Sequence, residues 1–147
     1  MDINLWSGGE YNNTLNNIQC NQDNQKVIIS DEYSINGETS FKIMRGGGTG
    51  YNWTRFRVPC TETGKTMTVK CRIYSPNASA DIWLCDMNGG STEGERTSIR
   101  VYPSKNVMEI SLTYTGKLTT LTHYALRINL LNDDTYLFVD DLSLTSS

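Results

Sequence analysis

The residues with the clearest chemical potential are two adjacent aspartates near the C-terminal end. Residues 137–144 read Leu-Phe-Val-Asp-Asp-Leu-Ser-Leu, with apolar positions at Leu137, Val139, Leu142 and Leu144. The period of two slips by one residue across the aspartates, and such a slip requires a β-bulge or a bend. Carboxylates next to a core are costly unless something positive neutralises them, and Ca²⁺ prefers carboxylate and carbonyl oxygens. The pattern fits a calcium site, and equally a strand that ends in solvated charge.

A second group of residues could bind a sugar. A sugar ring presents C–H groups on its faces and hydroxyls around its rim, so it needs an aromatic side chain flanked by Arg, Asn, Asp or Gln. Alternation with apolar neighbours predicts which side chains of four segments point away from the core. These are Trp53, Arg55 and Arg57; Trp83 and Cys85; Ser98, Arg100 and Tyr102; Arg127 and Asn129. The simpler interpretation of each is a core Trp or a solvated Arg.

Two alternatives to this outward face stay open. A site built from loops would use Tyr51 and Trp6, together with Arg45 and Glu95-Arg96. The other alternative concerns the strand that carries Trp83. A local hairpin of residues 67–73 with 81–87 would bury Trp83 and set Cys71 opposite Cys85, within reach of a disulfide.

The cysteines give little support to a metal centre. Cys20, Cys60, Cys71 and Cys85 show no C-x-x-C spacing, and His123 is the single histidine. A structural zinc site usually needs tighter pairs. Buried thiols are therefore the main prediction.

The elements that must position these residues are strands. Segments with period-two alternation or β-branched runs occur at 3–5, 26–30, 40–44, 53–58, 67–74, 81–87, 97–102, 107–114, 124–131 and 136–144. No segment sustains a 3.6-residue period, and Gly and Pro punctuate the chain. This pattern predicts an all-β protein, a two-sheet antiparallel sandwich of the jelly-roll type, in one domain spanning residues 1–147.

Composition and motifs exclude several functions. The net charge is −3 with both signs spread along the chain, which argues against a nucleic-acid binder. No apolar run approaches the roughly 18 residues needed to span a bilayer. The acidic residues do not form the carboxylate pair, about 5–10 Å apart, that glycoside hydrolysis needs, and no Gly-x-Ser-x-Gly elbow occurs. We expect no enzymatic activity.

Several motifs, taken in order, carry a resemblance. They are Asn4-Leu5 with Gly8–Glu10, then Ile35–Ile43, Trp53-Thr54, Gly64–Val69, Tyr74–Asn77, Ala125–Ile128 and Phe138–Leu144. Their order and spacing resemble the jelly-roll carbohydrate-binding modules found beside xylanases and glucanases. The paired aspartates are the most specific part, and the resemblance covers nearly the whole chain.

The resemblance implies a galactose-binding-domain-like sandwich of two roughly five-stranded sheets, with the four segments above in one concave sheet. It also implies a structural calcium ion bound by Glu10, by the backbone around residues 36–40 including Ser40, and by Asp140. The N-terminal stretch departs from the family's usual Gly-Asp/Asn-Phe-Glu pattern, so the resemblance supports Glu10 less than Asp140 as a ligand.

The implied function is non-catalytic binding of a polysaccharide by a module of a larger enzyme or assembly. The alternative is a structural or adhesion module, for example of a phage tail, with the same fold and no sugar affinity. The first residues lack the basic and apolar regions of a signal peptide. From the resemblance we nevertheless expect an extracellular, virion or cell-surface module.

Overall fold

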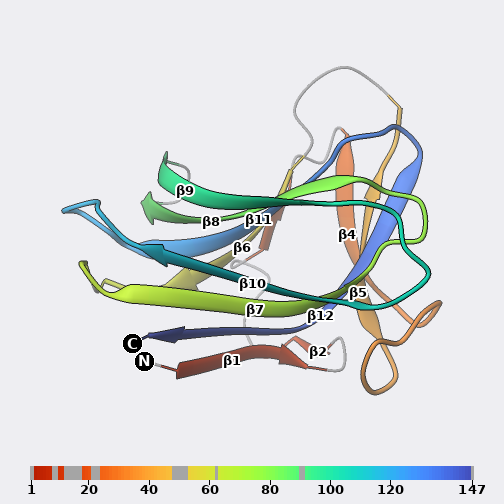
Figure 1. Ribbon diagram of the computed structural model, residues 1–147, viewed down its shortest axis with the longest axis horizontal. Coiled ribbons are helices and arrows are strands. Elements are labelled where there is room, and N and C mark those ends of the chain that lie inside the picture. Colours follow the sequence, from red (N-terminus) through yellow and green to blue (C-terminus); the bar gives the residue numbers. More distant parts are fainter. Residues whose placement is uncertain are drawn as a thin grey trace.

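Twelve strands form two antiparallel sheets in the computed structural model (Figure 1). The structure describes residues 2–7, 10–11, 18–20, 24–47, 53–61, 63–89 and 92–146, the first two ranges as backbone. No helix occurs among these residues, and hence none that is long and apolar enough to cross a membrane. The predicted all-β sandwich is confirmed.

The seven-stranded sheet has the order β10-β7-β12-β1-β2, with β5 also on β12 and β4 on β5. Its strands are β1 (Asp2–Ser7), β2 (Glu10–Tyr11), β4 (Gln25–Ser30), β5 (Ser40–Arg45), β7 (Thr66–Tyr74), β10 (Met108–Thr115) and β12 (Thr135–Ser146). The five-stranded sheet has the order β3-β6-β11-β8-β9. Its strands are β3 (Ile18–Cys20), β6 (Thr54–Pro59), β8 (Ala80–Asn88), β9 (Thr92–Val101) and β11 (His123–Leu130).

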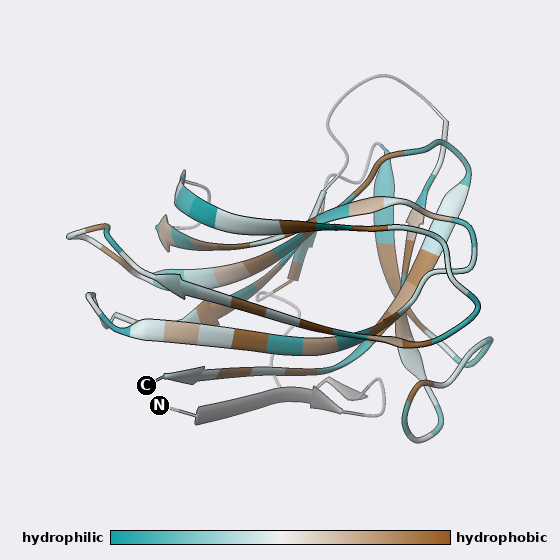
Figure 2. Cartoon of the chain, viewed as in Figure 1, coloured by the Kyte–Doolittle hydropathy of each residue, from teal (hydrophilic) through white to brown (hydrophobic). Residues whose placement is uncertain are grey.

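All ten strands expected from the sequence are present. Two further short strands, β2 and β3, lie in the N-terminal stretch that reads as loop, where the sequence has few β-branched residues. The other difference is the start of β9, which begins at Thr92, five residues before the expected position. The core lies between the sheets and takes one face of each strand. Apolar and polar positions alternate along β7 and β10 (Figure 2).

The last strand, β12, is the centre of the larger sheet. Its first half pairs with β5, its second half pairs with β1, and β7 runs along its other edge. The register with β7 shifts between Asp140 and Ser143, and Asp141 has a φ of 52°. Leu137, Val139, Leu142 and Leu144 all join the core. The predicted parity slip is therefore a β-bulge that keeps both halves of β12 facing the core.

The alternative prediction, a local hairpin of β7 with β8, is wrong. β7 pairs with β10 and β12, whereas β8 pairs with β9 and β11 in the opposite sheet. The cysteines are free, and Cys60, Cys71 and Cys85 are buried. Cys71 belongs to the core and Cys85 to a separate cluster, so the sandwich itself keeps these two thiols apart.

The bulge supplies a test through Asp141. Its left-handed conformation is unfavourable for most side chains but is tolerated by Asn and Asp, and its Oδ1 accepts a hydrogen bond from Asn36 Nδ2 at 2.9 Å. We expect Asp141→Ala to lower the free energy of unfolding by about 1–2 kcal/mol, measured by urea denaturation. Asp141→Asn keeps the conformational tolerance and an oxygen acceptor, so its loss should be smaller. Equal losses would contradict this role.

Candidate functional site

The outer face of the five-stranded sheet brings together side chains from four strands. We call this face the platform, and its central row is formed by Arg55 on β6, Arg127 on β11 and Trp83 on β8, which are direct cross-strand partners. Trp83 and Cys85 cluster with Met87 and Ala125, apart from the core. The predicted outward direction of these side chains is therefore correct.

Glu93 on β9 binds three members of this row. Its Oε2 accepts hydrogen bonds from Arg55 Nη1 at 3.0 Å and from Arg127 Nη1 at 2.6 Å. Its Oε1 accepts one from Trp83 Nε1 at 3.0 Å and faces Cys85 Sγ at 3.6 Å. A single carboxylate thus fixes two guanidinium groups and one indole.

Arginine and tryptophan side chains also stack on one another across the platform. The guanidinium of Arg55 lies 4.3 Å from the centre of the Trp53 ring, and that of Arg127 lies 4.4 Å from the Trp83 ring. Arg96, on the strand at the other side of β8, lies 4.2 Å from the same ring. Such cation–π contacts contribute about 0.5–2 kcal/mol each.

The two tryptophans therefore differ in what they can offer a ligand. Trp83 is only 8% exposed because arginines from both neighbouring strands cover it. Trp53, one residue before β6, is partly exposed. Of the two, Trp53 is the aromatic surface that remains available for stacking.

The network sets the protonation of its members. Burial alone would raise the pKa of Glu93, but the hydrogen bonds and charge of Arg127, with Trp83 and Arg55, hold that pKa below its ordinary value. Burial, followed by the nearby Glu93 charge, raises the pKa of the Cys85 thiol well above its usual range. At neutral pH the face therefore holds an ionised carboxylate and a neutral thiol.

The other predicted binding residues lie around this centre. Asn129 Oδ1 accepts a hydrogen bond from Arg127 Nε at 3.0 Å. Arg100 forms an ion pair with Asp81 at 2.7 Å, and Tyr102, just beyond β9, is 63% exposed. Arg57 lies opposite Ala125 on the same face.

The described residues give little support to a binding site built from loops. Tyr51 and the side chain of Trp6 lie outside them. Arg45 forms an ion pair with Asp133 at 3.1 Å, and Glu95 forms one with Lys117 at 2.7 Å. Arg96, assigned to that alternative, belongs instead to the platform.

Sequence reasoning missed Glu93 and assigned Arg96 to the wrong place because β9 begins earlier than expected. A bulge between β8 and β9 separates the Cys85–Arg96 pair from the Met87–Glu93 pair. Gly94 lies in it, where an added Cβ would come within 2.2 Å of Asp86 Oδ1. A glycine inside an otherwise polar strand is the signal that could have indicated this bulge.

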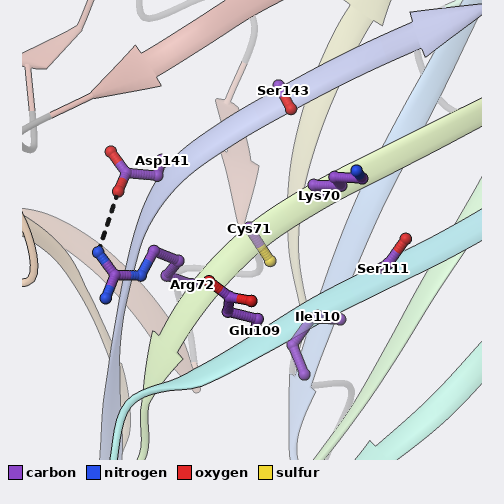
Figure 3. A pocket seen from close by; sticks show the side chains of 8 residues that line it. All are labelled: Lys70, Cys71, Arg72, Glu109, Ile110, Ser111, Asp141 and Ser143. Atoms are coloured by element: carbon purple, nitrogen blue, oxygen red, sulfur yellow. Dashed lines mark ion pairs between the residues drawn. The ribbon is translucent and has the colours of Figure 1, made fainter.

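A second surface feature lies on the outer face of the other sheet. A cavity of about 590 Å³ is lined by Lys70, Cys71, Arg72, Glu109, Ile110, Ser111, Asp141 and Ser143 (Figure 3). Arg72 points toward Asp141, with an ion pair of 3.5 Å. Its lining contains no aromatic side chain, so it lacks the stacking surface that a sugar ring needs.

The expected calcium ligands are placed only in part. Asp140 and Ser40 are fully buried, and the pairing of Val139 with Phe41 brings the two segments side by side. Ser40 Oγ accepts a hydrogen bond from Ile35 N at 3.0 Å, and the Glu10 side chain lies outside the described residues. No group of three His, Cys, Asp or Glu suited to a metal occurs among the described side chains. The buried Asp140 carboxylate fits a cation that takes its other ligands from backbone oxygens.

The chain resembles known proteins in its fold. No protein-family model and no curated protein matches the chain. Among solved structures, the C-terminal family 22 carbohydrate-binding module of Clostridium thermocellum Xyn10B superposes with a TM-score of 0.68 and 12% identity, over 96% of this chain and 91% of that one. The chain therefore has the same jelly-roll fold as that module.

Two other structures share this fold. A family 11 carbohydrate-binding module from Clostridium thermocellum, in complex with a β-1,3-1,4-mixed-linked tetrasaccharide, matches with a TM-score of 0.65 and 12% identity, over 92% of each chain. The enzymatically active domain of bacteriophage CBA120 tailspike protein 4 matches 99% of this chain with a TM-score of 0.72 and 10% identity. The chain spans only 22% of that tailspike structure.

Replacing Glu93 tests the network. Because Glu93→Gln removes the charge that two poorly exposed arginines share, we expect a loss of about 3 kcal/mol in unfolding free energy at pH 7. Since the folded-state pKa of Glu93 is lowered from 4.5, its contribution is complete above that value and is lost as the pH falls through the folded-state pKa. Urea denaturation at pH 7 and at a series of lower pH values should show the two proteins converging as the solution is acidified.

The matched control is Glu95→Gln, which breaks the exposed pair with Lys117. Its effect should be much smaller than that of Glu93→Gln. A gap between wild type and Glu93→Gln that stays constant with pH would contradict the assigned role of Glu93.

Proposed function

We propose that this chain binds a polysaccharide, without catalysis, through the platform on its five-stranded sheet. The observation that carries the proposal is the cluster of tryptophan and arginine side chains on this face, in which Glu93 holds Arg55, Arg127 and Trp83 in place. Tryptophan offers a flat apolar surface to a sugar ring, and Arg and Asn donate to its hydroxyls. A network fixed before binding lowers the entropy lost when the ligand is bound.

Other observations support a binding module. The structures with the same fold include modules named for carbohydrate binding, one of them holding a tetrasaccharide. The platform also joins aromatic and polar groups on one sheet, whereas the cavity of the other sheet has no aromatic side chain in its lining.

The carboxyl groups of the platform are poorly suited to glycoside hydrolysis. That reaction needs a carboxyl group whose pKa is raised so that it can donate a proton. Glu93 has a lowered pKa, and Asp81 is engaged by Arg100. We therefore favour binding over turnover, and a chain that acts as an extracellular, virion or cell-surface module of a larger enzyme or assembly.

A structural or adhesion role is the second candidate. It is favoured by the similarity to part of a phage tailspike protein. In that case the platform would serve as a rigid surface, and no polysaccharide would be retained. Affinity-gel electrophoresis on a panel of polysaccharides separates the two roles.

Trp53 gives the sharper binding test, because Trp83 is buried and its truncation would cost about 3–5 kcal/mol of stability. We expect Trp53→Ala to weaken binding about tenfold, equivalent to about 1.4 kcal/mol, while the loss of its contact with Arg55 lowers the free energy of unfolding by only about 0.5–2 kcal/mol. Trp53→Phe should retain most of the affinity because it keeps an aromatic face. The measurement is retardation in an affinity gel that contains the bound polysaccharide.

The control is Tyr136→Ala, which removes a partly buried aromatic from the other sheet. Its binding should equal that of the unsubstituted protein. If Trp53→Ala binds normally, or if Tyr136→Ala loses as much affinity, the platform is not the binding surface.

We also propose a structural Ca²⁺ held by Asp140 with backbone oxygens of the segment before β5. A cation that binds the folded chain alone raises its stability by mass action. Chelation should therefore lower the melting temperature by several degrees, and added Ca²⁺ should restore it. Asp140→Asn should abolish this calcium-dependent shift, whereas Glu109→Gln on the same sheet should keep it. A melting temperature that chelation leaves unchanged in the unsubstituted protein would refute the site.

A further inference from the structure

Positive charge gathers on the platform. The described charged residues that project from this face are Arg55, Arg57, Arg96, Arg100 and Arg127, against Asp81 and Glu93. The chain as a whole has a net charge of −3. The face is therefore opposite in sign to the molecule, and it attracts anions while the rest of the surface repels them.

Part of this charge is not neutralised within the network. Arg55 and Arg127 share the single carboxylate of Glu93. Arg96 is exposed, lies over the Trp83 ring at 4.2 Å from its centre, and forms no ion pair with the described residues. Burial and then the positive charge of Arg57 lower the pKa of His123, so the histidine adds no charge of its own at neutral pH.

Two of these arginines lie at the ends of one cross-strand row of the platform. Arg57, Ala125, Cys85 and Arg96 form one row across four adjacent strands. Ala125 and Cys85 are small and fully buried. The row spans three strand spacings, or about 14 Å between the end residues. Two cationic side chains thus lie on one face at a separation that a chain-like ligand could span.

Glu93 shows how this surface binds a carboxylate. Its oxygens receive two guanidinium N–H groups and one indole N–H, at distances from 2.6 to 3.0 Å. Charge-assisted hydrogen bonds of this kind are the strong ones, and arginine suits a planar carboxylate. Arg96, at the edge of the platform, carries the same guanidinium donors and is exposed.

From these observations we propose that the ligand is an acidic polysaccharide, one whose sugar residues carry carboxylate groups. This inference rests on the proposed function. The uronate carboxylates pair with Arg96 and Arg57, and a sugar ring stacks on Trp53. A neutral polysaccharide would leave the arginine charge unused, since it offers hydroxyls alone.

The test compares acidic polysaccharides with their neutral counterparts. Polygalacturonate, alginate and glucuronoxylan are each offered before and after chemical reduction of their carboxyl groups, and binding is measured by isothermal titration calorimetry. We expect at least one acidic polymer to bind and its reduced form to bind at least tenfold more weakly. Binding of that acidic polymer should also weaken between about 0.1 and 1 M salt, because screening shortens from about 10 to 3 Å.

Charge-matched variants locate the effect on the platform. Arg96→Gln should lower the affinity for the acidic polymer several-fold and reduce the salt dependence. Lys70→Gln removes the same charge from the outer face of the other sheet and should leave both unchanged. Thermal melting of each variant establishes that it is folded.

The outcomes distinguish this inference from the proposed function. Equal binding of acidic and reduced polymers would overturn the inference and keep the proposed function. Retention of no polysaccharide in any form, acidic, reduced or neutral, would overturn both. Equally tight binding of single-stranded DNA would show a face that binds anions regardless of the sugar, and would also overturn the inference.

Discussion

The sandwich depends on one bulge in its last strand. β12 is the strand to which β5, β7 and β1 all pair, so any error in its register would spread through most of the larger sheet. A strand of twelve residues twists, and β5 and β1 each cover only part of its edge. The extra residue at Asp140–Asp141 lets the strand bend while Val139 and Leu142 both face the core. The two aspartates fill the place where the backbone leaves regular pairing, and each serves differently. Asp141 takes the left-handed conformation, whereas Asp140 is buried between strands.

A second bulge, in the five-stranded sheet, determines how the side chains of the platform are arranged. The bulge between β8 and β9 directs Glu93 on β9 toward Arg127 on β11 and Arg55 on β6. These two strands lie beyond β8 in the sheet. Gly94 permits this because no side chain would fit against Asp86. The network gains rigidity from the arrangement, but it also covers Trp83. Preorganisation and exposed aromatic area therefore compete on this face, and the competition leaves Trp53 and Arg96 as the groups able to meet a ligand.

The sequence was sufficient for those features that follow from alternation. The strands, the two-sheet architecture, the slip at Asp140–Asp141 and the outward direction of Arg55, Trp83 and Arg127 all depend on a period of two, which local sequence records directly. Local sequence does not show which strands pair with one another. Whether β7 pairs with β8 or lies in the opposite sheet depends on contacts far apart in the chain, and the local hairpin was physically reasonable. Glu93 was missed for a related reason, because a bulge resets the alternation on which the prediction depended.

The fold alone leaves the ligand open, since this sandwich is shared by proteins only 10–12% identical to the chain. Recognition must come from side chains that the scaffold does not need. Arg55, Arg127 and Trp83 are largely occupied with one another, so their loss would report on stability as much as on binding. Arg96 and Trp53 are the informative residues, because they are more exposed. They stack on members of the network but do not bind Glu93. Arg96 forms no ion pair with the described residues, so its charge contributes little to stability through salt bridges. Its presence on the positive face of an acidic chain, which also carries the partly exposed Trp53, is better explained by a ligand that carries negative charge.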